Sequence, residues 1–182
     1  MSSTRKGAGI LPISIKDNQI YFLFGKENKY NDTPGWADFG GGIEKNENVF
    51  NSAIREGWEE STGFLGSPQE IKKKILKNKK RCIQLPTYTT YLLPIEYDEK
   101  MIEYFNLAQN CIQKNLSKNI ITNTYIFEKQ EIKWFSFKEM EKNIHSFRNF
   151  YQQIIQILLN KKEEFKKYTR RKKSSKRKTK KI

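Results

Sequence analysis

Alternating and periodic apolar residues in the first third of the chain predict two strands followed by a helix. Residues 9–15 and 20–24 are β-rich and flank a polar turn at residues 16–19, and residues 25–27 are expected to leave the sheet. Residues 48–60 contain no proline and predict a helix of about three turns. The apolar side of this helix is formed by Val49, Phe50, Ala53, Ile54 and Gly57. Ala53 and Gly57 are small enough for close packing against a sheet.

Further strands and helices are predicted in the rest of the chain. A Gly-Ser-Pro sequence at residues 66–68 ends the first helical region. Residues 99–114 have the apolar period of an amphipathic helix, and residues 147–159 have that of a long closing helix against the sheet. Three segments rich in β-branched and aromatic residues predict strands: residues 87–93, 124–127 and 131–135.

A change in composition at residue 166 divides the chain. We interpret residues 1–165 as one domain and residues 166–182 as a basic tail. The formal net charge is +15, and the tail holds eleven basic residues and no acidic one, which leaves +4 for the domain. Such a run of like charges repels itself and is predicted to be disordered. It would attract RNA or DNA phosphates, act as a nuclear-targeting signal, or only raise solubility.

The sequence indicates neither a membrane protein nor a secreted one. No apolar run approaches the roughly eighteen residues of a membrane span, and the N-terminus lacks the apolar stretch of a signal peptide. Cys82 and Cys111 are isolated and are interpreted as partly buried thiols in a reducing compartment. We therefore expect an intracellular, cytoplasmic protein, or a nuclear one if the tail is a targeting signal. His145 is expected at the surface or at a helix start rather than in catalysis.

Three glutamates on the first predicted helix break local preferences. Glu56, Glu59 and Glu60 have i, i+3, i+4 spacing, so their carboxylates share one edge. Like charges at this spacing cost roughly 0.2–0.5 kcal/mol per pair, and acidic groups in a last turn oppose the helix dipole. Either nearby lysines or a hard divalent cation, which prefers oxygen ligands, would offset the repulsion. A structure in which these carboxylates point apart, or are covered by lysines with no hollow beside them, would contradict the cation.

The spacing around these glutamates resembles the Nudix box of the Nudix hydrolase superfamily, G-x5-E-x7-R-E-U-x-E-E-x-G-U, where U is a bulky aliphatic residue. The residues in register with that pattern are Gly41, Glu47, Arg55, Glu56, Glu59 and Glu60. There are two departures within the box, which ends at Phe64. Gly57 replaces a bulky aliphatic residue, and one additional residue precedes Gly63. Before the box, Asp38-Phe39 stands where family members usually have Phe-Pro.

The resemblance implies an α/β fold, namely a Nudix-type α/β/α sandwich with a mixed central β-sheet and a loop-helix-loop catalytic box. It also implies dependence on Mg2+ or Mn2+, held by Glu56, Glu59 and Glu60. The catalytic set that it implies comprises Glu47, Arg55, Glu56, Glu59, Glu128 and Glu131. In this set Glu47 and Arg55 form a pair that orients Glu56. Glu128 and Glu131 are alternatives for a further ligand or general base, and Glu128 is preferred because it lies in a predicted loop.

The resemblance further implies contacts to a nucleotide-type diphosphate substrate. Gly40, Gly41 and Gly42 give a backbone that turns sharply and approaches the metal and the phosphates closely. Lys26 is interpreted either as a phosphate contact or as a solvated lysine. The lysine-rich residues 72–81 are interpreted either as a solvated surface or as a cationic rim for polyphosphate or RNA.

The activity implied by the resemblance is hydrolysis of a pyrophosphate bond in a nucleoside diphosphate linked to another moiety. One hypothesis for the substrate is the mRNA cap, because Nudix decapping enzymes combine this box with basic RNA-binding surfaces. A second is a small nucleotide, a dinucleoside polyphosphate or a diphosphoinositol polyphosphate. A third hypothesis is an RNA-binding module without catalysis, and the intact box glutamates argue against it. The oligomeric state is left open.

Overall fold

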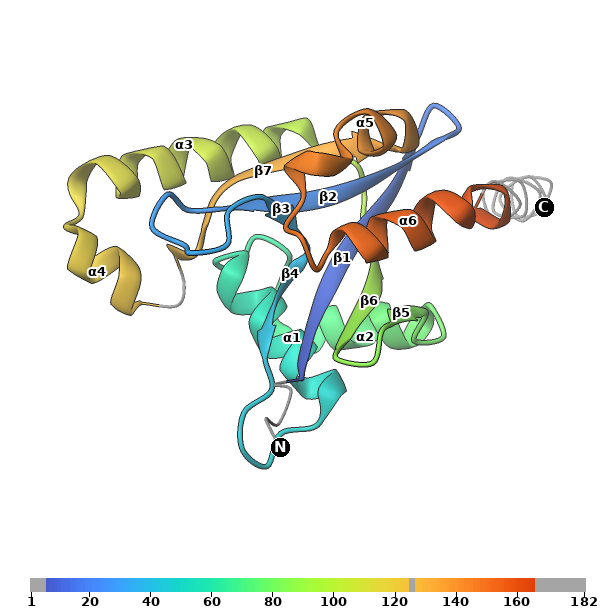
Figure 1. Ribbon diagram of the computed structural model, residues 1–182, viewed down its shortest axis with the longest axis horizontal. Coiled ribbons are helices and arrows are strands. Elements are labelled where there is room, and N and C mark those ends of the chain that lie inside the picture. The colour runs from blue at the N-terminus through green and yellow to red at the C-terminus, as the bar shows by residue number, and fades with distance from the viewer. Residues whose placement is uncertain (1–5, 125–126, 166–182) are drawn as a thin grey trace, which may run out of the picture.

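The computed structural model describes residues 6–124 and 127–165, in which the predicted strands and helices form one mixed sheet with helices on both faces (Figure 1). The strands are β1 (Gly7–Lys16), β2 (Gln19–Glu27), β3 (Trp36–Ala37), β4 (Phe39–Gly42), β5 (Cys82–Gln84), β6 (Tyr88–Pro94) and β7 (Lys129–Ser136). The α-helices are α1 (Val49–Glu60), α2 (Pro68–Lys77), α3 (Glu99–Asn115), α4 (Lys118–Asn123), α5 (Phe137–Lys142) and α6 (Gln152–Asn160).

Strand β1 is the centre of the sheet. Its residues from Gly7 to Ile13 pair with β6 in parallel, whereas its other edge is shared by two antiparallel strands. The glycine strand β4 pairs with the first half of β1, and β2 pairs with the second half. Strand β2 continues away from β1 and pairs with β7 and β3. Because β1 and β2 separate in this way, the sheet opens between β4 and the β2–β7 pair.

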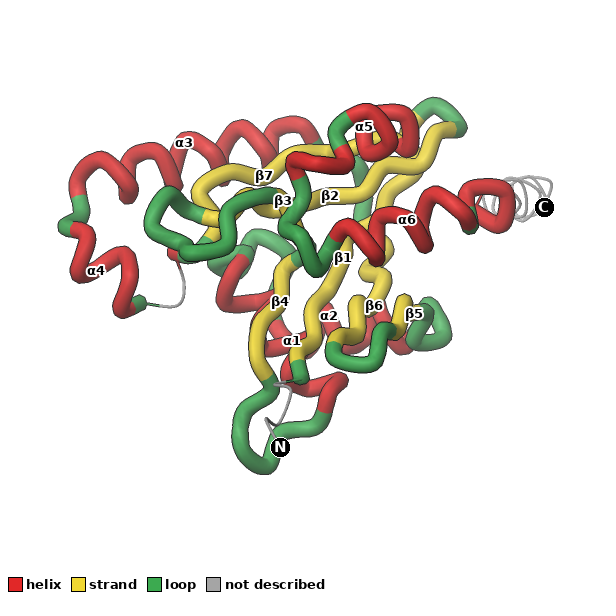
Figure 2. Tube along the Cα trace, in the orientation of Figure 1, coloured by secondary structure: helices red, strands yellow, loops and turns green. Residues whose placement is uncertain are grey.

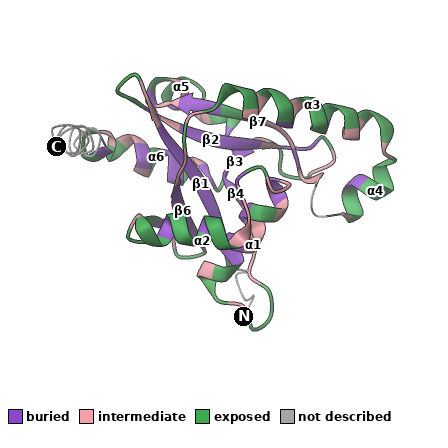
Figure 3. Cartoon of the chain, turned by 180° about the vertical axis from the view of Figure 1, so that it is seen from behind, coloured by how far each residue is buried: buried purple, intermediate pink, exposed green. Residues whose placement is uncertain are grey.

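Two apolar clusters cover the two faces of the sheet. One lies beneath α5 and α6 and includes Phe22, Phe24 and Tyr151. The other lies beneath α1, α2 and α3 and includes Ile10 and Phe105. The buried strands between exposed helix surfaces are visible from the opposite side in Figure 3, and the layers can be followed in Figure 2. The α/β/α sandwich with a mixed sheet is therefore confirmed.

The packing of α1 on β1 explains the missing aliphatic residue in the box. A Cβ added to Gly57 would lie 2.2 Å from Cδ1 of Ile10. The side chain of Ile10, which is fully buried, thus occupies the space that a larger residue at position 57 would need. The additional residue at the end of the box is accommodated in the turn after α1, where Thr62 has a φ of 48° and Gly63 a φ of 78°.

Several element boundaries differ from the predictions. Residues 25–27 do not leave the sheet, because β2 continues to Glu27 through its pairing with β7. The closing helix α6 begins only at Gln152, and Phe147 instead fills the core through contacts with other aromatic rings. Residues 124–127 were predicted as a strand; α4 ends at Asn123, the residue after it caps the helix, and residues 125–126 lie outside the described part of the chain.

Three helices and the exposure of the two thiols also differ from the predictions. Helices α2, α4 and α5 were not predicted, although capping boxes are present at the start of α2 (Ser67 and Glu70) and of α5 (Ser136 and Glu139). Cys82 and Cys111 are exposed rather than partly buried, since each stands on an outward-facing position. His145 is exposed in a short 3-10 turn, as expected.

The basic tail, residues 166–182, lies outside the described residues. Within the described ranges, no helix combines the length and the apolar character that crossing a membrane requires.

Candidate functional site

Helix α1 presents the predicted acidic residues beside the glycine strand β4. Asn48 begins the helix by accepting a hydrogen bond from the backbone N–H of Asn51 at 2.9 Å. Ala53 and Ile54 are buried beneath the helix, and Glu60 is buried at its last turn. The sequence pattern that places the apolar residues against the sheet therefore also directs Glu60 into the protein.

Arg55 joins the carboxylates at the outer side of this helix. Its Nε donates to Glu47 Oε1 at 3.1 Å, and its Nη2 donates to Glu47 Oε2 at 2.9 Å, which gives a bidentate pair. Its Nη1 donates to Glu56 at 2.9 Å and to Glu59 at 3.0 Å. The hydrogen bonds from Arg55 are the main reason that the pKa of Glu47 is lowered. The pairing expected between Glu47 and Arg55 is present, and Arg55 also holds Glu56 directly.

Glu56 lies between solvent and the interior, with a side chain that is 14% exposed. Burial raises its pKa to about 7, although Arg55 opposes this shift, and the charges of Glu59 and Glu128 add to it. Removing the carboxylate from water disfavours its charged form. Glu56 therefore combines a near-neutral pKa with a fixed orientation.

The three consecutive glycines form an extended strand rather than the sharp turn that was expected. Gly40 N–H donates to Glu60 Oε2 at 2.6 Å, and the Gly42 carbonyl accepts from Arg55 at 3.1 Å. A Cβ added to Gly41 would lie 2.6 Å from a carboxylate oxygen of Glu56. The expected close approach of backbone is thus present, and it is made to the acidic side chains of α1.

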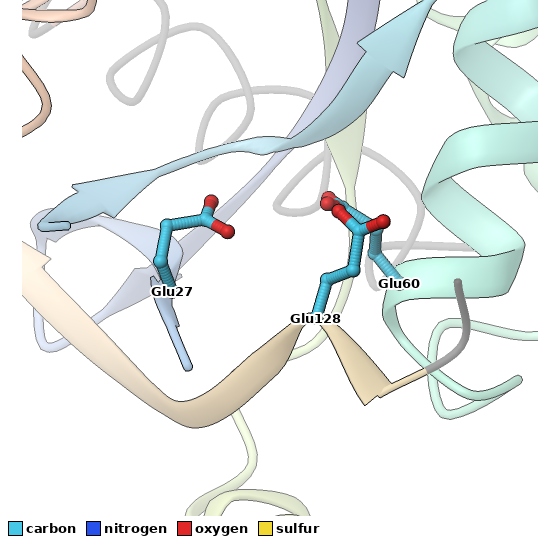
Figure 4. Close-up of side chains that lie close together, drawn as sticks. All are labelled: Glu27, Glu60 and Glu128. Carbon is cyan, nitrogen blue, oxygen red and sulfur yellow. The ribbon is translucent and has the colours of Figure 1, made fainter. Parts of the chain in front are cut away.

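A second group of carboxylates lies deeper, at the opening of the sheet. Glu60 comes from α1, Glu27 from the end of β2 and Glu128 from the loop before β7, and their carboxylates converge (Figure 4). One oxygen from each lies within 4.8 Å of the other two. Glu60 and Glu128 were predicted as site residues, whereas Glu27 was not.

Lys129 and Arg148 bring positive charge into this second group. The fully buried Lys129 Nζ lies 3.3 Å from Glu60 Oε2 and makes a short ion pair with Glu27. Arg148 donates to the same Glu27 oxygen at 2.9 Å, and Asn31 donates to the other at 2.8 Å. Glu27 is therefore held by three donors. Lys129 thus contacts the box residue Glu60. A nearby lysine was one of the two sources of compensating charge expected for the box glutamates.

Burial dominates the electrostatics of the deeper group. It raises the pKa of Glu60 well above the ordinary value, against the attraction of Lys129, and the charges of Glu27 and Glu128 add to the shift. Burial also raises the pKa of Glu128, again opposed by Lys129. Burial alone would lower the pKa of Lys129, but Glu27 and Glu60 more than reverse this, so its pKa is raised.

The structure divides the predicted site residues into those near the acidic centre and those away from it. The predicted edge of three carboxylates is not formed, since Glu56 and Glu59 share Arg55 while Glu60 turns toward Glu128. This contradicts a cation held by Glu56, Glu59 and Glu60 together, and of these three only Glu60 belongs to the deeper group. Lys26 and Glu131 face each other across β2 and β7 at 3.6 Å, with about two-fifths of each side chain exposed. Glu131 therefore forms an ion pair with Lys26 and does not belong to the deeper group of carboxylates.

The donor set fits a hard divalent cation. Carboxylate oxygens from Glu60 and Glu128 converge in a largely buried position, and Glu56 lies close enough to raise the pKa of Glu60 electrostatically. Such oxygens are the ligands that Mg2+ and Mn2+ prefer. Gly41 leaves the space that the Glu56 carboxylate fills. Lys129 and the Gly40 N–H both contact Glu60 Oε2 and would compete with a cation for that oxygen.

An open groove of about 420 Å³ adjoins the acidic helix. It lies between α1 and α2 and is lined by residues that include Arg55, Trp58, Gln69 and Lys72. Trp58 is 42% exposed. The groove therefore offers an aromatic face and positive charge next to the arginine that holds Glu56. The described residues that line the groove include Arg55 but none of the site glutamates, so the groove adjoins the arginine rather than the carboxylates.

Comparison with known proteins identifies the fold. No protein-family model matches the sequence, and a search of curated proteins also found no match. Among solved structures, a C. elegans Ap4A hydrolase in a binary complex matches with a TM-score of 0.53 and 18% identity, over 88% of this chain and 97% of that one. A bifunctional NMN adenylyltransferase/ADP ribose pyrophosphatase from Francisella tularensis matches with a TM-score of 0.52 and 16% identity, over 88% of this chain and 42% of that one. The same Francisella protein complexed with AMP and a manganese ion matches with a TM-score of 0.51.

These matches show a shared architecture. The chain has the α/β fold of Nudix hydrolases, with its mixed seven-stranded sheet between helical layers.

Proposed function

We propose that this protein is a metal-dependent hydrolase that cleaves a pyrophosphate bond in a nucleoside diphosphate linked to another moiety. The observation that carries the proposal is the convergence of Glu60 and Glu128 beside Glu56, on the fold of Nudix hydrolases. Mutually repelling, largely buried carboxylates are unfavourable without a compensating charge. They are favourable when they hold a divalent cation against phosphate oxygens.

In this proposal Glu60 and Glu128 hold the cation, with Glu56 beside them. A divalent cation, when bound, supplies charge neutralisation to the diphosphate and lowers the pKa of a bound water. Glu56 accepts the proton of the attacking water, because a carboxylate with a pKa of about 7 is matched to general-base catalysis near neutral pH. Arg55, fixed by Glu47, keeps the Glu56 carboxylate in place. Glu59 shares that arginine and contributes a second negative charge at the outer edge.

The first candidate for the substrate comes from the names of the similar structures. The similar structures carry names that refer to Ap4A and to ADP-ribose pyrophosphate hydrolysis, which supports a substrate with a nucleoside diphosphate portion. The manganese ion in the name of one of them supports a divalent cation. A small nucleotide of this kind, including a dinucleoside or diphosphoinositol polyphosphate, is one candidate.

The groove between α1 and α2 favours a capped RNA as the second candidate. The exposed indole of Trp58 can stack on a base, and Lys72 at the start of the lysine-rich helix can contact phosphate. In this form of the proposal the cleavage is decapping. The eleven basic residues of the tail would add nonspecific attraction to RNA.

A panel of substrates tests both the proposed hydrolase activity and the identity of its substrate. Capped RNA, dinucleoside polyphosphates, ADP-ribose and diphosphoinositol polyphosphates are offered with Mg2+, Mn2+ or EDTA, to the full chain and to a chain that ends at residue 165. Metal-dependent release of a nucleoside phosphate from any of them supports the hydrolase. Cap cleavage that weakens without the tail supports decapping, and efficient cleavage of small nucleotides with capped RNA untouched supports the first candidate. RNA binding without turnover of any substrate would contradict the enzyme and leave a binding module.

A further inference from the structure

Gly25 of β2 leaves room for the side chain of Lys129. A Cβ added to Gly25 would lie 2.8 Å from Lys129 Cδ and 2.9 Å from its Cγ, so the aliphatic stem of the lysine covers this glycine. The pairing of β2 with β7 shifts register between Lys26 and Glu27, where Glu27 comes opposite Lys129. A β-bulge of this kind redirects a side chain. Lys129 therefore points inward, with no exposed side-chain surface.

The ammonium of Lys129 lies at the acidic centre formed by Glu27, Glu60 and Glu128. Lys129 Nζ is anchored by Glu27, whose two oxygens are also engaged by Arg148 and Asn31. From that anchor the ammonium reaches Glu60 Oε2 at 3.3 Å. The same Glu60 oxygen accepts the Gly40 N–H at 2.6 Å. The Lys129 ammonium thus binds Glu27 closely and contacts Glu60, the proposed cation ligand, at longer range.

We propose that Lys129 is a built-in counter-ion that occupies the acidic centre when no divalent cation is bound and yields Glu60 to the cation when one binds. The inference rests on the proposed function, since it concerns the same centre. Its basis is the unequal hold of Lys129 on its two partners. Glu27 binds the ammonium closely in a position that also holds Arg148, whereas the contact with Glu60 is longer and is the one that a cation would replace.

Charge explains why such a counter-ion is needed and what it changes. Glu27, Glu60 and Glu128 bring three carboxylates into a largely buried position, and Lys129 and Arg148 supply two positive charges. Without Lys129 the empty centre would hold buried carboxylates with too little compensation. With Lys129 present, an incoming divalent cation meets a positive charge at short range and binds more weakly. Lys129 therefore keeps the centre folded without metal and limits its affinity for metal.

The test measures metal binding rather than turnover. Mn2+ affinity is determined by calorimetry for the full chain, for Lys129→Met and for the matched control Lys133→Met, which removes an exposed lysine from the same strand. We expect Lys129→Met to bind Mn2+ at least about tenfold more tightly than the unmodified protein, and Lys133→Met to bind it unchanged. Thermal melting should show a larger rise on Mn2+ addition for Lys129→Met than for either other protein. Equal or weaker Mn2+ binding by Lys129→Met would overturn the counter-ion.

A measurement on the unmodified protein keeps the proposal testable if Lys129→Met does not fold. The ammonium resonance of Lys129 is followed in protein labelled with 15N at lysine Nζ, and is assigned by its loss in Lys129→Arg. Mg2+ at saturation should shift this resonance, because the contact with Glu60 is lost. A resonance that stays in place while calorimetry reports bound Mg2+ would overturn the inference and leave the hydrolase proposal standing. If the unmodified protein and Lys133→Met bind neither Mg2+ nor Mn2+, the proposed metal-dependent function itself fails, and the counter-ion role fails with it.

Discussion

Arg55 and Lys129 each hold a group of glutamates, but the two groups differ in exposure and in origin. The Arg55 group contains Glu47, Glu56 and Glu59, and the arginine side chain is 24% exposed. All its members come from α1 and the loop just before it. The Lys129 group joins strands whose paired residues are 102 positions apart in sequence, and both partners are fully buried. The Arg55 guanidinium organises a local motif, whereas the Lys129 ammonium connects segments that are far apart in the sequence.

The difference follows from the chemistry of the two side chains. A guanidinium presents several donors in a fixed plane, so Arg55 can serve three carboxylates at the edge of the protein at once. An ammonium is a compact charge on a flexible stem, and in Lys129 it reaches a fully buried position. We therefore expect changes in the Lys129 group to alter metal binding and stability, and changes in the Arg55 group to alter the orientation of Glu56.

The comparison is tested most strongly by Glu60→Gln. Glutamine keeps the shape and an acceptor for the Gly40 N–H, but it removes the negative charge that the cation requires. We expect metal-dependent hydrolysis to fall about a thousandfold, with an unchanged circular dichroism spectrum. The matched variant Glu59→Gln, which changes a carboxylate held by Arg55, should lose much less activity. Equal losses for the two variants would remove the distinction between the groups.

Arg55→Lys tests the outer group itself. Lysine keeps the positive charge but cannot donate at once to Glu47, Glu56 and Glu59 as the guanidinium does. Because Glu56 would lose its fixed orientation, we expect turnover to fall roughly tenfold to a hundredfold. Mn2+ affinity, measured by calorimetry, should change less than turnover. A variant with full turnover would show that the charge alone is sufficient.

Asp38→Asn adds a third case to the comparison of the two groups, because Asp38 is a buried carboxylate that accepts hydrogen bonds from hydroxyl groups. Asp38 is fully buried and accepts hydrogen bonds from Tyr88 and Thr90, both at 2.8 Å. Burial raises its pKa from 3.8 to about 6. A raised carboxyl pKa stabilises the folded state below the unfolded pKa, and this contribution is lost as the pH rises through the folded pKa.

The asparagine variant lacks this loss of stability between about pH 4 and pH 6. The free energy of unfolding of Asp38→Asn, relative to the unmodified protein, should therefore increase across that window by as much as roughly 3 kcal/mol. Urea denaturation at pH 4, 5, 6 and 7 measures the difference. Two parallel stability curves would contradict the raised pKa of Asp38.

The smallest effect is expected at Trp58, which lies outside both groups of carboxylates. Trp58 is 42% exposed and lies outside the buried core, so Trp58→Ala should lower the melting temperature only slightly. If the indole stacks on a base of RNA, the KM for capped RNA should rise roughly fivefold to tenfold, while the KM for a small nucleotide stays the same. An equal change for both substrates would remove the support that the groove gives to decapping.

The outer group was predictable from the sequence in part, because its geometry is local: the Glu47–Arg55 pair and the shared edge of Glu56 and Glu59 were expected, whereas Glu60 was expected on that edge and lies in the inner group. Glu56, Glu59 and Arg55 are close on one helix, and helical periodicity alone brings them together. The apolar side of α1 was predicted in part, since Ala53 and Ile54 are buried whereas Val49 is 36% exposed. Helix α2 was missed because a run of lysines suggested only a surface, although the Ser67–Glu70 capping box was visible in the sequence.

The inner group could not be predicted in full, since it depends on the pairing of distant strands. Glu27 was expected to follow the end of a strand, and its pairing with Lys129 of β7 keeps it in the sheet. The register shift beside it decides that Lys129 points inward, and a change of one residue in register reverses which face a side chain takes. Glu128 was chosen over Glu131 from its loop position, and the structure brings Glu128 to the other carboxylates.

The contact between Gly57 and Ile10 links two positions that are far apart in the sequence. Because the isoleucine side chain fills the place of a Cβ at residue 57, neither position is free to change size alone. A relative with an aliphatic residue at position 57 would need a smaller residue at position 10 or a helix set farther from the strand. The pair therefore acts as a spacer that fixes the height of α1 above the sheet, so a change of size at one position requires a compensating change at the other.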